Sequence, residues 1–263
     1  MIMKDKIVWI TGASSGIGEA LVYKYYKEGA KLIISARNRD ELFRVKGNCK
    51  NAMQVHVLSL DLEQHGSLDQ KAAEALRIFG KIDLLINSGG VSQRSLALET
   101  EAATEHRIMN VNLWATVALS KAVLPGMIAN GGGQIVCISS LVGKFGTKLR
   151  SAYAASKHAL HGYFDSLRAE VYDQNIRITM ICPGFIKTQV SINALTGDGS
   201  PHGEMDTAQE NGMLVEECAK QIFDAVKAKK EEVYIGGKEV KGVLFKRLFP
   251  ARFSKYIRNA DVT

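Results

Sequence analysis

The sequence predicts an α/β fold, a doubly wound parallel sheet of about seven strands with helices on both faces. Short apolar runs alternate with stretches of helical spacing along the chain, and this alternation is typical of a parallel sheet flanked by helices. A length of 263 residues fits one α/β unit. The chain has no internal repeat, low-complexity segment or linker. We therefore expect a single domain over residues 1–263.

Apolar runs bounded by polar or glycine-containing segments indicate the strands of this sheet. The second strand begins at Lys31 and ends before Arg37, and the stretch before residue 31 has helical spacing. The other expected strands, in chain order, are Ile7–Ile10, Met53–Leu58, Ile82–Ile86, Gln134–Ile138 and Ile176–Ile181.

A glycine turn follows the first strand, within residues 11–18. Gly12, Gly16 and Gly18 have the spacing G-x-x-x-G-x-G, and a helix is expected from about Ile17. Such a helix directs unpaired N–H groups and its positive dipole end at the turn, which suits a pyrophosphate. Gly12 supplies the tight turn, while the other two glycines remove Cβ atoms that would block phosphates or packing. An ordinary strand-to-helix loop is the alternative.

A second motif places Tyr153 and Lys157 four residues apart, on one face of an expected helix. Free tyrosine has a pKa of about 10, and a neighbouring ammonium lowers that pKa by favouring the phenolate. Ser140 follows the strand Gln134–Ile138, at the carboxyl edge of the sheet where open α/β sheets bind ligands. An isolated Y-x-x-x-K is usually a solvated helix face. In combination with Ser140 and the glycine turn, it favours an acid–base site.

Together these motifs resemble the short-chain dehydrogenase/reductase family, in its single-domain branch, over nearly the whole chain. The resemblance implies a three-layer Rossmann fold. Asn87-Ser88-Gly89-Gly90 departs from the family's usual Asn-Asn-Ala-Gly, which we expect to change only packing against adenosine. Segments 88–96, 155–160 and 181–184 look most like the group called SDR family member 7. Further matches in family order are Asp61-Leu62, Asn112 and Pro183-Gly184.

The resemblance also implies a role for each active-site residue. Tyr153 is the general acid in carbonyl reduction and the base in alcohol oxidation, while Ser140 donates a hydrogen bond to the substrate oxygen. Lys157 lowers the pKa of Tyr153 and binds the nicotinamide ribose. Asn112 holds a water in a proton path to solvent, or, in the alternative, is a helix-packing or helix-kink residue. The residues expected to bind the cofactor are Gly12, Ser14, Ser15, Gly16, Ile17, Gly18, Arg37, Asp61, Leu62, Asn87, Gly89, Tyr153, Lys157, Pro183, Gly184, Ile186 and Thr188.

The end of the second strand indicates NADP(H) as the cofactor. A carboxylate there would bind the ribose 2′-hydroxyl of NAD, and residues 31–39 contain none. Arg37 follows Ala36, with Arg39 close behind, and a guanidinium suits the 2′-phosphate of NADP through paired charge-assisted hydrogen bonds. Alternatively, both arginines are solvated at the start of the next helix. NADP(H) is the prediction, and in cells it favours reduction.

Cysteine usage and apolar runs indicate where the protein works. The four cysteines are scattered without a C-x-x-C pair, which indicates reduced thiols in a cytoplasmic compartment. Neither they nor the six histidines have ligand spacing, so we expect no metal site. No signal peptide and no apolar run of membrane-spanning length is expected. The net charge of +7 comes with no nucleic-acid motif, so we expect no nucleic-acid partner.

Two segments after Pro183 are expected to shape the substrate pocket. The substrate-loop region 185–212 has apolar residues followed by the glycine-rich patch 197–201, which suggests a mobile lid over a lipophilic pocket. A disordered surface loop is the alternative. The C-terminal segment 238–263 interleaves basic and apolar residues and is broken at Pro250. It lies on an anionic membrane surface, or packs over the pocket or a subunit partner, which we favour.

These features predict an NADP(H)-dependent oxidoreductase that interconverts a carbonyl and a secondary or primary alcohol on a small lipophilic substrate, of the steroid, retinoid or xenobiotic carbonyl class. One alternative is a catalytically idle NADP-binding or scaffold protein, which loss of an active-site residue would have favoured. Another is a nucleotide-sugar epimerase, which normally needs more chain after Pro183. The resemblance implies a homodimer or homotetramer paired through the helices that carry Asn112 and Tyr153.

Overall fold

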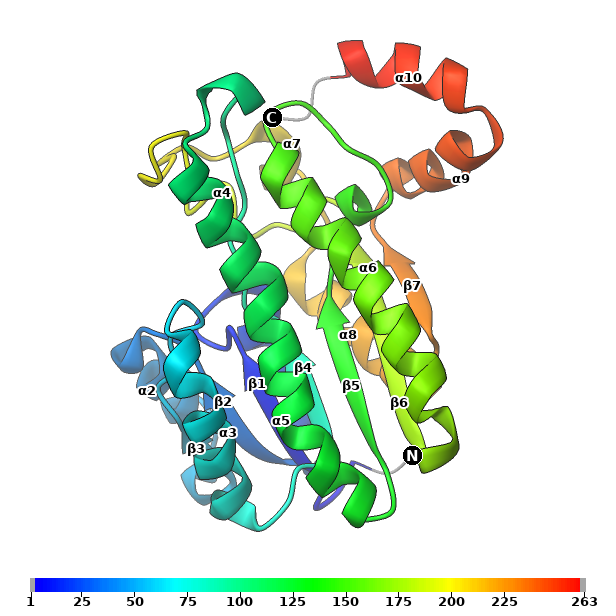
Figure 1. Ribbon diagram of the computed structural model, residues 1–263. Helices are drawn as coiled ribbons and strands as arrows, with labels where there is room; N and C mark the ends of the chain where they lie inside the picture. Colours follow the sequence, from blue (N-terminus) through cyan, green and yellow to red (C-terminus); the bar gives the residue numbers. More distant parts are fainter. Residues whose placement is uncertain (1–2, 261–263) are drawn as a thin grey trace.

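A central parallel sheet organises the molecule (Figure 1). The computed structural model describes residues 3–260, in which seven strands pair in the order β3-β2-β1-β4-β5-β6-β7. The chain builds outward from β1 to β3, then crosses back to β4 and builds the other way, so a switch point lies between β1 and β4. The predicted fold class is confirmed. The strands are β1 (Ile7–Thr11), β2 (Lys31–Ser35), β3 (Val55–Val57), β4 (Leu84–Asn87), β5 (Gly133–Ile138), β6 (Ile176–Pro183) and β7 (Glu232–Ile235).

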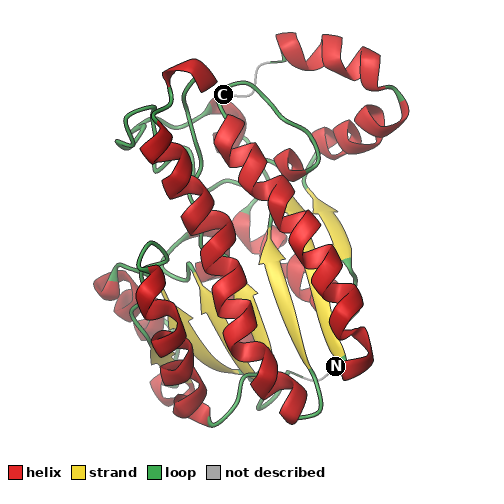
Figure 2. Cartoon of the chain, viewed as in Figure 1, coloured by secondary structure: helices red, strands yellow, loops and turns green. Residues whose placement is uncertain are grey.

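Helices cover both faces of the sheet (Figure 2). Successive strand side chains point to opposite faces, so Val8 and Ile10 join an apolar core with α1, α2 and α8, whereas Trp9 joins the core with α3, α5 and α6. The α-helices are α1 (Gly16–Lys27), α2 (Arg39–Gly47), α3 (His65–Phe79), α4 (Ala102–Met109), α5 (Ala115–Ala129), α6 (Ser151–Val171), α7 (Thr207–Glu210), α8 (Val215–Lys227), α9 (Lys241–Leu248) and α10 (Pro250–Asn259). Short 3-10 helices are η1 (Ala52–Gln54), η2 (Ala97–Glu99), η4 (Leu141–Gly143), η5 (Tyr172–Gln174) and η6 (Lys238–Val240).

A π-helical segment, η3 (Asn110–Trp114), joins α4 to α5 in one continuous helix. This helix, residues 102–129, is long and apolar enough to span a membrane by length and composition alone. The prediction that no apolar run has that length was therefore wrong. Polar residues such as Asn110 and Asn112 interrupt this stretch in the sequence, so it does not stand out there as one apolar run. More than half of its most apolar window is buried inside the protein, and it packs there as a core helix.

Two segments that follow β6, the substrate-loop region 185–212 and the C-terminal segment, lie at the carboxyl ends of the strands, near the top of Figure 1. The substrate-loop region 185–212 contains α7 and is tied down by isolated bridges, including one between Gln93 and Leu195. The C-terminal segment forms α9 and α10, and Pro250 is the first residue of α10, a position that needs no N–H donor. Residues 261–263 of that segment lie outside the described residues.

Candidate active site

A cavity of about 1130 Å³ opens at the carboxyl edge of the sheet. It runs from the glycine turn after β1, past Ser140, Tyr153 and Lys157, to the apolar side chains of α9 and α10. Of the residues predicted for the site, all line this cavity except Asn87 and Asn112. One continuous space therefore joins the predicted cofactor site to the predicted acid–base site.

The glycine turn has the close approaches that its spacing predicted. Gly12 has φ of +63°, and a Cβ on it would lie 2.6 Å from the Gly89 Cα. A Cβ on Gly18 would lie 2.1 Å from the Gly12 carbonyl oxygen, so this position cannot carry a side chain without moving the backbone. Ser15 precedes α1 and its side chain caps no N–H group there. The first N–H groups of α1 are left for an anion at the cavity wall, which fits a pyrophosphate.

Arg37 lies just beyond β2 and lines the cavity, with 57% of its side chain exposed. Its guanidinium is 3.2 Å from the Glu63 carboxylate, which also pairs with Arg107 at 2.9 Å. Sequence reasoning missed Glu63, although it directly follows the Asp61-Leu62 match. Arg39, by contrast, is the first residue of α2 and its guanidinium lies 5.4 Å from the centre of the Phe43 ring, so it follows the alternative of a helix-start arginine.

Ser140, Tyr153 and Lys157 meet at the middle of the cavity. Ser140 caps η4, where its hydroxyl accepts a hydrogen bond from the Val142 N–H at 3.3 Å. The Lys157 ammonium donates to the Ile138 carbonyl at 2.8 Å and lies 5.7 Å from the centre of the Tyr153 ring. The predicted pair on one helix face is therefore present, beside the end of β5.

The electrostatics of the pair differ from the prediction that Lys157 lowers the pKa of Tyr153. Burial raises the pKa of Tyr153, and a hydrogen bond with Ser140 and the positive charges of Arg150 and Arg94 only partly oppose it. Burial also lowers the pKa of Lys157, to about 8. Because burial raises a pKa that is already about 10 for free tyrosine, Tyr153 is a phenol at neutral pH.

Asn112 sits in η3 and is only 1% exposed. Its side chain accepts from the Val91 N–H and donates to the Val91 carbonyl, both at 2.9 Å, and it also donates to the Ser156 hydroxyl at 3.0 Å. These contacts hold the segment after β4 against α6. The side chain is thus engaged as a packing clamp, and the water-holding role that the resemblance implies stays a prediction. Asn87 is likewise buried, and donates to the Ser120 hydroxyl at 3.2 Å.

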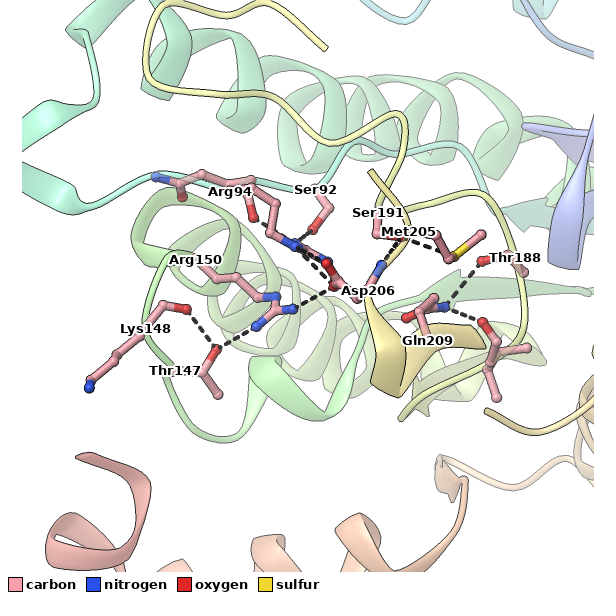
Figure 3. A network of polar contacts seen from close by, with 12 residues as sticks. Ser92, Arg94, Thr147, Lys148, Arg150, Thr188, Ser191, Met205, Asp206 and Gln209 are labelled. Atoms are coloured by element: carbon pink, nitrogen blue, oxygen red, sulfur yellow. Dashed lines mark hydrogen bonds and ion pairs between the residues drawn. The ribbon is translucent and has the colours of Figure 1, made fainter. Parts of the chain in front are cut away.

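A buried ionic network fastens the substrate-loop region to the site (Figure 3). Asp206, from this region, accepts hydrogen bonds from Arg94 at 3.0 Å and from Arg150 at 3.1 Å. The three side chains are between 2% and 7% exposed. Arg94 follows β4 and Arg150 immediately precedes α6, so one carboxylate holds three segments together. Sequence reasoning missed this network, since Arg94 and Asp206 are 112 residues apart.

Gln93 is a further buried residue that the sequence analysis did not single out. Its side-chain oxygen accepts from the N–H groups of Ala152 at 2.8 Å and Tyr153 at 3.2 Å. Its amide nitrogen donates to the hydroxyls of Ser95, Thr100 and Ser151. A glutamine from the segment after β4 therefore caps the first turn of α6 and fixes the backbone of Tyr153.

His161, Cys182 and Glu232 form a cluster behind the site, with ligand-type atoms within 4.8 Å of one another. A ring nitrogen of His161 lies 3.1 Å from the Ser139 hydroxyl, and the other lies 3.2 Å from the Glu232 carboxylate. The prediction of no metal site rested on sequence spacing, which could not bring these residues together. Glu232 is already paired with the Lys144 ammonium at 2.5 Å, so we interpret the cluster as polar contacts that tie α6 to β7.

Comparisons with known proteins agree with this geometry. Residues 6–198 match the family model described as short chain dehydrogenase. The chain is 44% identical over 242 residues to a "Dehydrogenase/reductase SDR family protein 7-like" of Anopheles gambiae, spanning 89% of this chain and 75% of that protein. It is 40% identical over 238 residues to "Dehydrogenase/reductase SDR family member 7B" of Mus musculus, spanning 89% of this chain and 74% of that protein.

Solved structures share the fold over nearly the whole chain. A short-chain dehydrogenase from Streptomyces avermitilis has a TM-score of 0.83 at 25% identity, covering 98% of this chain and all of that chain. A short-chain dehydrogenase/reductase from Burkholderia phymatum, solved in complex with NAD, has a TM-score of 0.84 at 20% identity, covering all of this chain and 98% of that chain. The predicted resemblance, down to the member 7 group, is confirmed.

Proposed function

Since this chain belongs to the short-chain dehydrogenase family, we propose that it is an NADP(H)-dependent oxidoreductase that interconverts a carbonyl and an alcohol on a lipophilic substrate. Family membership makes it an oxidoreductase that uses a nicotinamide cofactor. The one observation that carries the finer proposal is the continuous cavity of about 1130 Å³, which has Arg37 at one end, Tyr153 in the middle and aromatic side chains at the other end.

The residues at the first end of the cavity fit a dinucleotide. The uncapped first turn of α1 offers N–H groups to a pyrophosphate, and the glycine at position 12 lets the backbone approach Gly89 closely. When bound, the nicotinamide cofactor supplies the hydride. Lys157 would hold the nicotinamide ribose. Residues 183–188 would cover the bound cofactor, since Thr188 lies close over the glycine turn: a Cβ on Gly16 would be only 3.2 Å from its side chain.

The proton chemistry belongs to the side chains at the middle of the cavity. Ser140 donates a hydrogen bond to the substrate oxygen and stabilises the negative charge that develops there. Tyr153, a phenol at neutral pH because burial raises its pKa, donates the proton that completes an alcohol. The Lys157 ammonium, close to the tyrosine ring, stabilises the phenolate that remains. In the oxidative direction the same phenolate takes the proton back.

Arg37 supports the choice of NADP(H) over NAD(H). Its exposed guanidinium lines the cavity just beyond β2, and a 2′-phosphate there would accept paired hydrogen bonds from it. Glu63, which now pairs with Arg37, keeps a second partner in Arg107. Arg37 can therefore turn to a phosphate without leaving the carboxylate unpaired.

Apolar side chains support a lipophilic substrate of the steroid, retinoid or xenobiotic carbonyl class. The far end of the cavity is lined by Phe145, Phe245, Phe253 and Tyr256, and such surfaces bind apolar ligands by removing them from water. We also propose a cytoplasmic location, supported by four free, buried cysteines. The homodimer or homotetramer stays a prediction, which light scattering of the purified chain would test.

The test of cofactor choice is a fluorescence titration of the protein with NADPH and with NADH. We expect NADPH to bind more tightly, and Arg37→Ala to weaken only NADPH, by roughly 10- to 100-fold for a lost charged hydrogen bond. Arg39→Ala is the matched control, since this arginine lies outside the cavity lining. A preference for NADH would overturn the NADP(H) proposal. Binding of neither nucleotide would overturn the oxidoreductase proposal.

A screen of carbonyl compounds tests the substrate class. With NADPH present, we expect aromatic and polycyclic ketones or aldehydes to be reduced faster than small hydrophilic ones, because the far end of the cavity is apolar. Tyr153→Phe distinguishes turnover at this site from contaminating activity. Turnover confined to small hydrophilic carbonyls would contradict the lipophilic class while leaving the cofactor result intact.

A further inference from the structure

We propose that α9 and α10, residues 241–259, form a docking surface for an anionic lipid bilayer. These two helices, here called the C-terminal hairpin, stand to one side of the sheet, beyond the carboxyl ends of the strands (Figure 1). The proposal concerns the exposed side chains of the hairpin. Docking itself does not depend on the proposed function.

The inner face of the hairpin is fixed to the body of the protein by aromatic packing. Phe253 is buried and its ring centre lies 5.2 Å from that of Phe145 and 5.7 Å from that of Phe245. The Lys246 ammonium donates to the Lys144 carbonyl at 2.9 Å. These contacts match the expectation that the segment packs over the pocket. They also orient the hairpin, so that its opposite face is presented to the surroundings as a fixed surface.

Large apolar side chains on the hairpin are left in water. Those exposed by between 49% and 60% are Leu244, Leu248, Phe249 and Tyr256. They are gathered within thirteen consecutive residues, whereas the other exposed apolar side chains of the described residues are spread over the rest of the chain. Leu244 and Leu248 are one helical turn apart and so share a face of α9. Exposed apolar side chains gathered in one short segment mark an interaction site.

Basic residues are interleaved with these apolar side chains along the hairpin, without any acidic residue. Between residues 240 and 260 the chain has Lys241, Lys246, Arg247, Arg252, Lys255 and Arg258 and no aspartate or glutamate. In the part of the chain that the structure describes, no ion pair uses any of the six. Apolar side chains interleaved with unneutralised cations match the interface of an anionic bilayer, where acyl chains and headgroup charges lie side by side.

The position of the cavity favours a bilayer, rather than an acidic protein, as the partner of the hairpin. Lys241, Tyr256 and Ile257 belong to the hairpin and also line the cavity, and Tyr256 is 59% exposed. The surface that would touch the bilayer is therefore continuous with the wall of the pocket. If the proposed function holds, a lipophilic substrate dissolved in the bilayer could reach Tyr153 without crossing water.

Vesicle flotation with the purified full-length chain tests the docking. We expect binding to phosphatidylcholine vesicles that contain phosphatidylserine, little binding to phosphatidylcholine alone, and weaker binding at higher salt. The double variants Leu248→Glu/Phe249→Glu and Arg247→Glu/Arg252→Glu should each reduce binding at least about tenfold. Met53→Glu is the matched control, because Met53 is 89% exposed but lies outside the hairpin. Circular dichroism and NADPH titration would verify that each variant is folded.

Three outcomes would overturn the proposal. They are no binding to either vesicle at low salt, binding that the hairpin variants leave unchanged, and a dimer by light scattering that Leu248→Glu/Phe249→Glu converts to monomer, which would make a second copy the occupant. Flotation needs no turnover. Failure of vesicle binding would thus leave the NADPH result standing, and failure of NADPH binding would leave the docking result standing.

Discussion

The two ends of the cavity are built in different ways. At the cofactor end, Gly12, Gly16 and Gly18 act within seven consecutive residues, and the backbone supplies the binding groups. At the substrate end, side chains distant in sequence hold the wall together, as Arg94 and Asp206 do across 112 residues. The first end is therefore a local device, whereas the second exists only once the chain has folded. Each end should therefore fail separately.

Tyr153→Phe should have the largest effect, because Tyr153 stands where the two ends meet. The change removes one hydroxyl and keeps the ring that packs near Lys157. We expect kcat to fall by about 10²- to 10⁴-fold, the range for loss of a positioned acid, with NADPH affinity nearly unchanged. Single-turnover kinetics beside fluorescence titration would measure both. Retained turnover would remove Tyr153 from the proton step.

Asp206→Asn should break the substrate end alone. It leaves two buried guanidiniums beside a neutral amide, and the loss of one partner of a buried ion pair costs about 3–5 kcal/mol. We expect a lower melting temperature and a higher KM for the carbonyl. Asp198→Asn in the same loop is the control, since among the described residues the Asp198 carboxylate accepts hydrogen bonds only from nearby Thr196 and Ser200. If NADPH affinity fell in parallel, the two ends would not be separable.

Gln93→Leu should have a smaller effect that spans both ends. It removes the acceptor for the Ala152 and Tyr153 N–H groups, at a cost of about 1–3 kcal/mol for buried donors left unpaired. We expect kcat to fall more than KM changes, because Tyr153 loses its backbone support. Gln93→Glu keeps the acceptor and should restore much of kcat, which loss of stability alone does not predict. Equal kcat in both variants would contradict a positioning role.

The pH dependence of stability tests the buried lysine at the point where the two ends meet. The pKa of Lys157 is about 8 in the folded protein and about 10.4 when unfolded. Between these values the unfolded chain binds more protons, so the free energy of unfolding rises with pH and levels off above about 10.4. Each unit of pKa difference is worth about 1.4 kcal/mol. Urea unfolding of wild type and Lys157→Met over this pH range would measure this contribution. If the difference in their free energies of unfolding did not change with pH, the lowered pKa of Lys157 would be contradicted.

The pH dependence of turnover follows from Tyr153. Because burial raises the pKa of this phenol, reduction should keep its rate through neutral pH and decline only in alkaline solution. Oxidation, which needs the phenolate, should rise with pH over the same range. Initial rates in both directions would show this. If the rate of reduction decreased as the pH was lowered below neutral, another group would control the proton transfer.

The sequence predicted the local devices well. The glycine turn, the Tyr153 and Lys157 pair and the strand pattern are all read within one element or one turn, so residue spacing is enough to find them. Arg37 was likewise placed at the end of a strand, and it lies just beyond β2 at the cavity; its role toward NADP(H) stays a proposal. The fold class followed from the alternation of apolar runs with helical patterns, since that alternation leaves few arrangements for a parallel sheet.

What escaped prediction depends on pairs that only folding creates. Asp206 and Arg150 look like ordinary surface charges in sequence, and Gln93 looks like an ordinary loop residue, yet all three are buried. The upward shift of the Tyr153 pKa escaped too, because the sequence shows the neighbouring lysine but not how deeply the tyrosine is buried. The spacing of residues in the sequence shows which side chains can come together. How their pKa values change then depends on how deeply they are buried in the fold.

The π-helical segment η3 lets one continuous helix pack against two different neighbours. An α-helix turns about 100° per residue, and a π-helical turn contains one residue more than an α-helical turn, so η3 rotates α5 relative to α4 by about that angle. Before the segment the helix contacts α6, and after it the helix contacts α3. Deleting Val111 would restore the regular winding and turn the buried side of α5 away from α3. The helix thus contains, in effect, a single-residue insertion that redirects its buried face from α6 to α3.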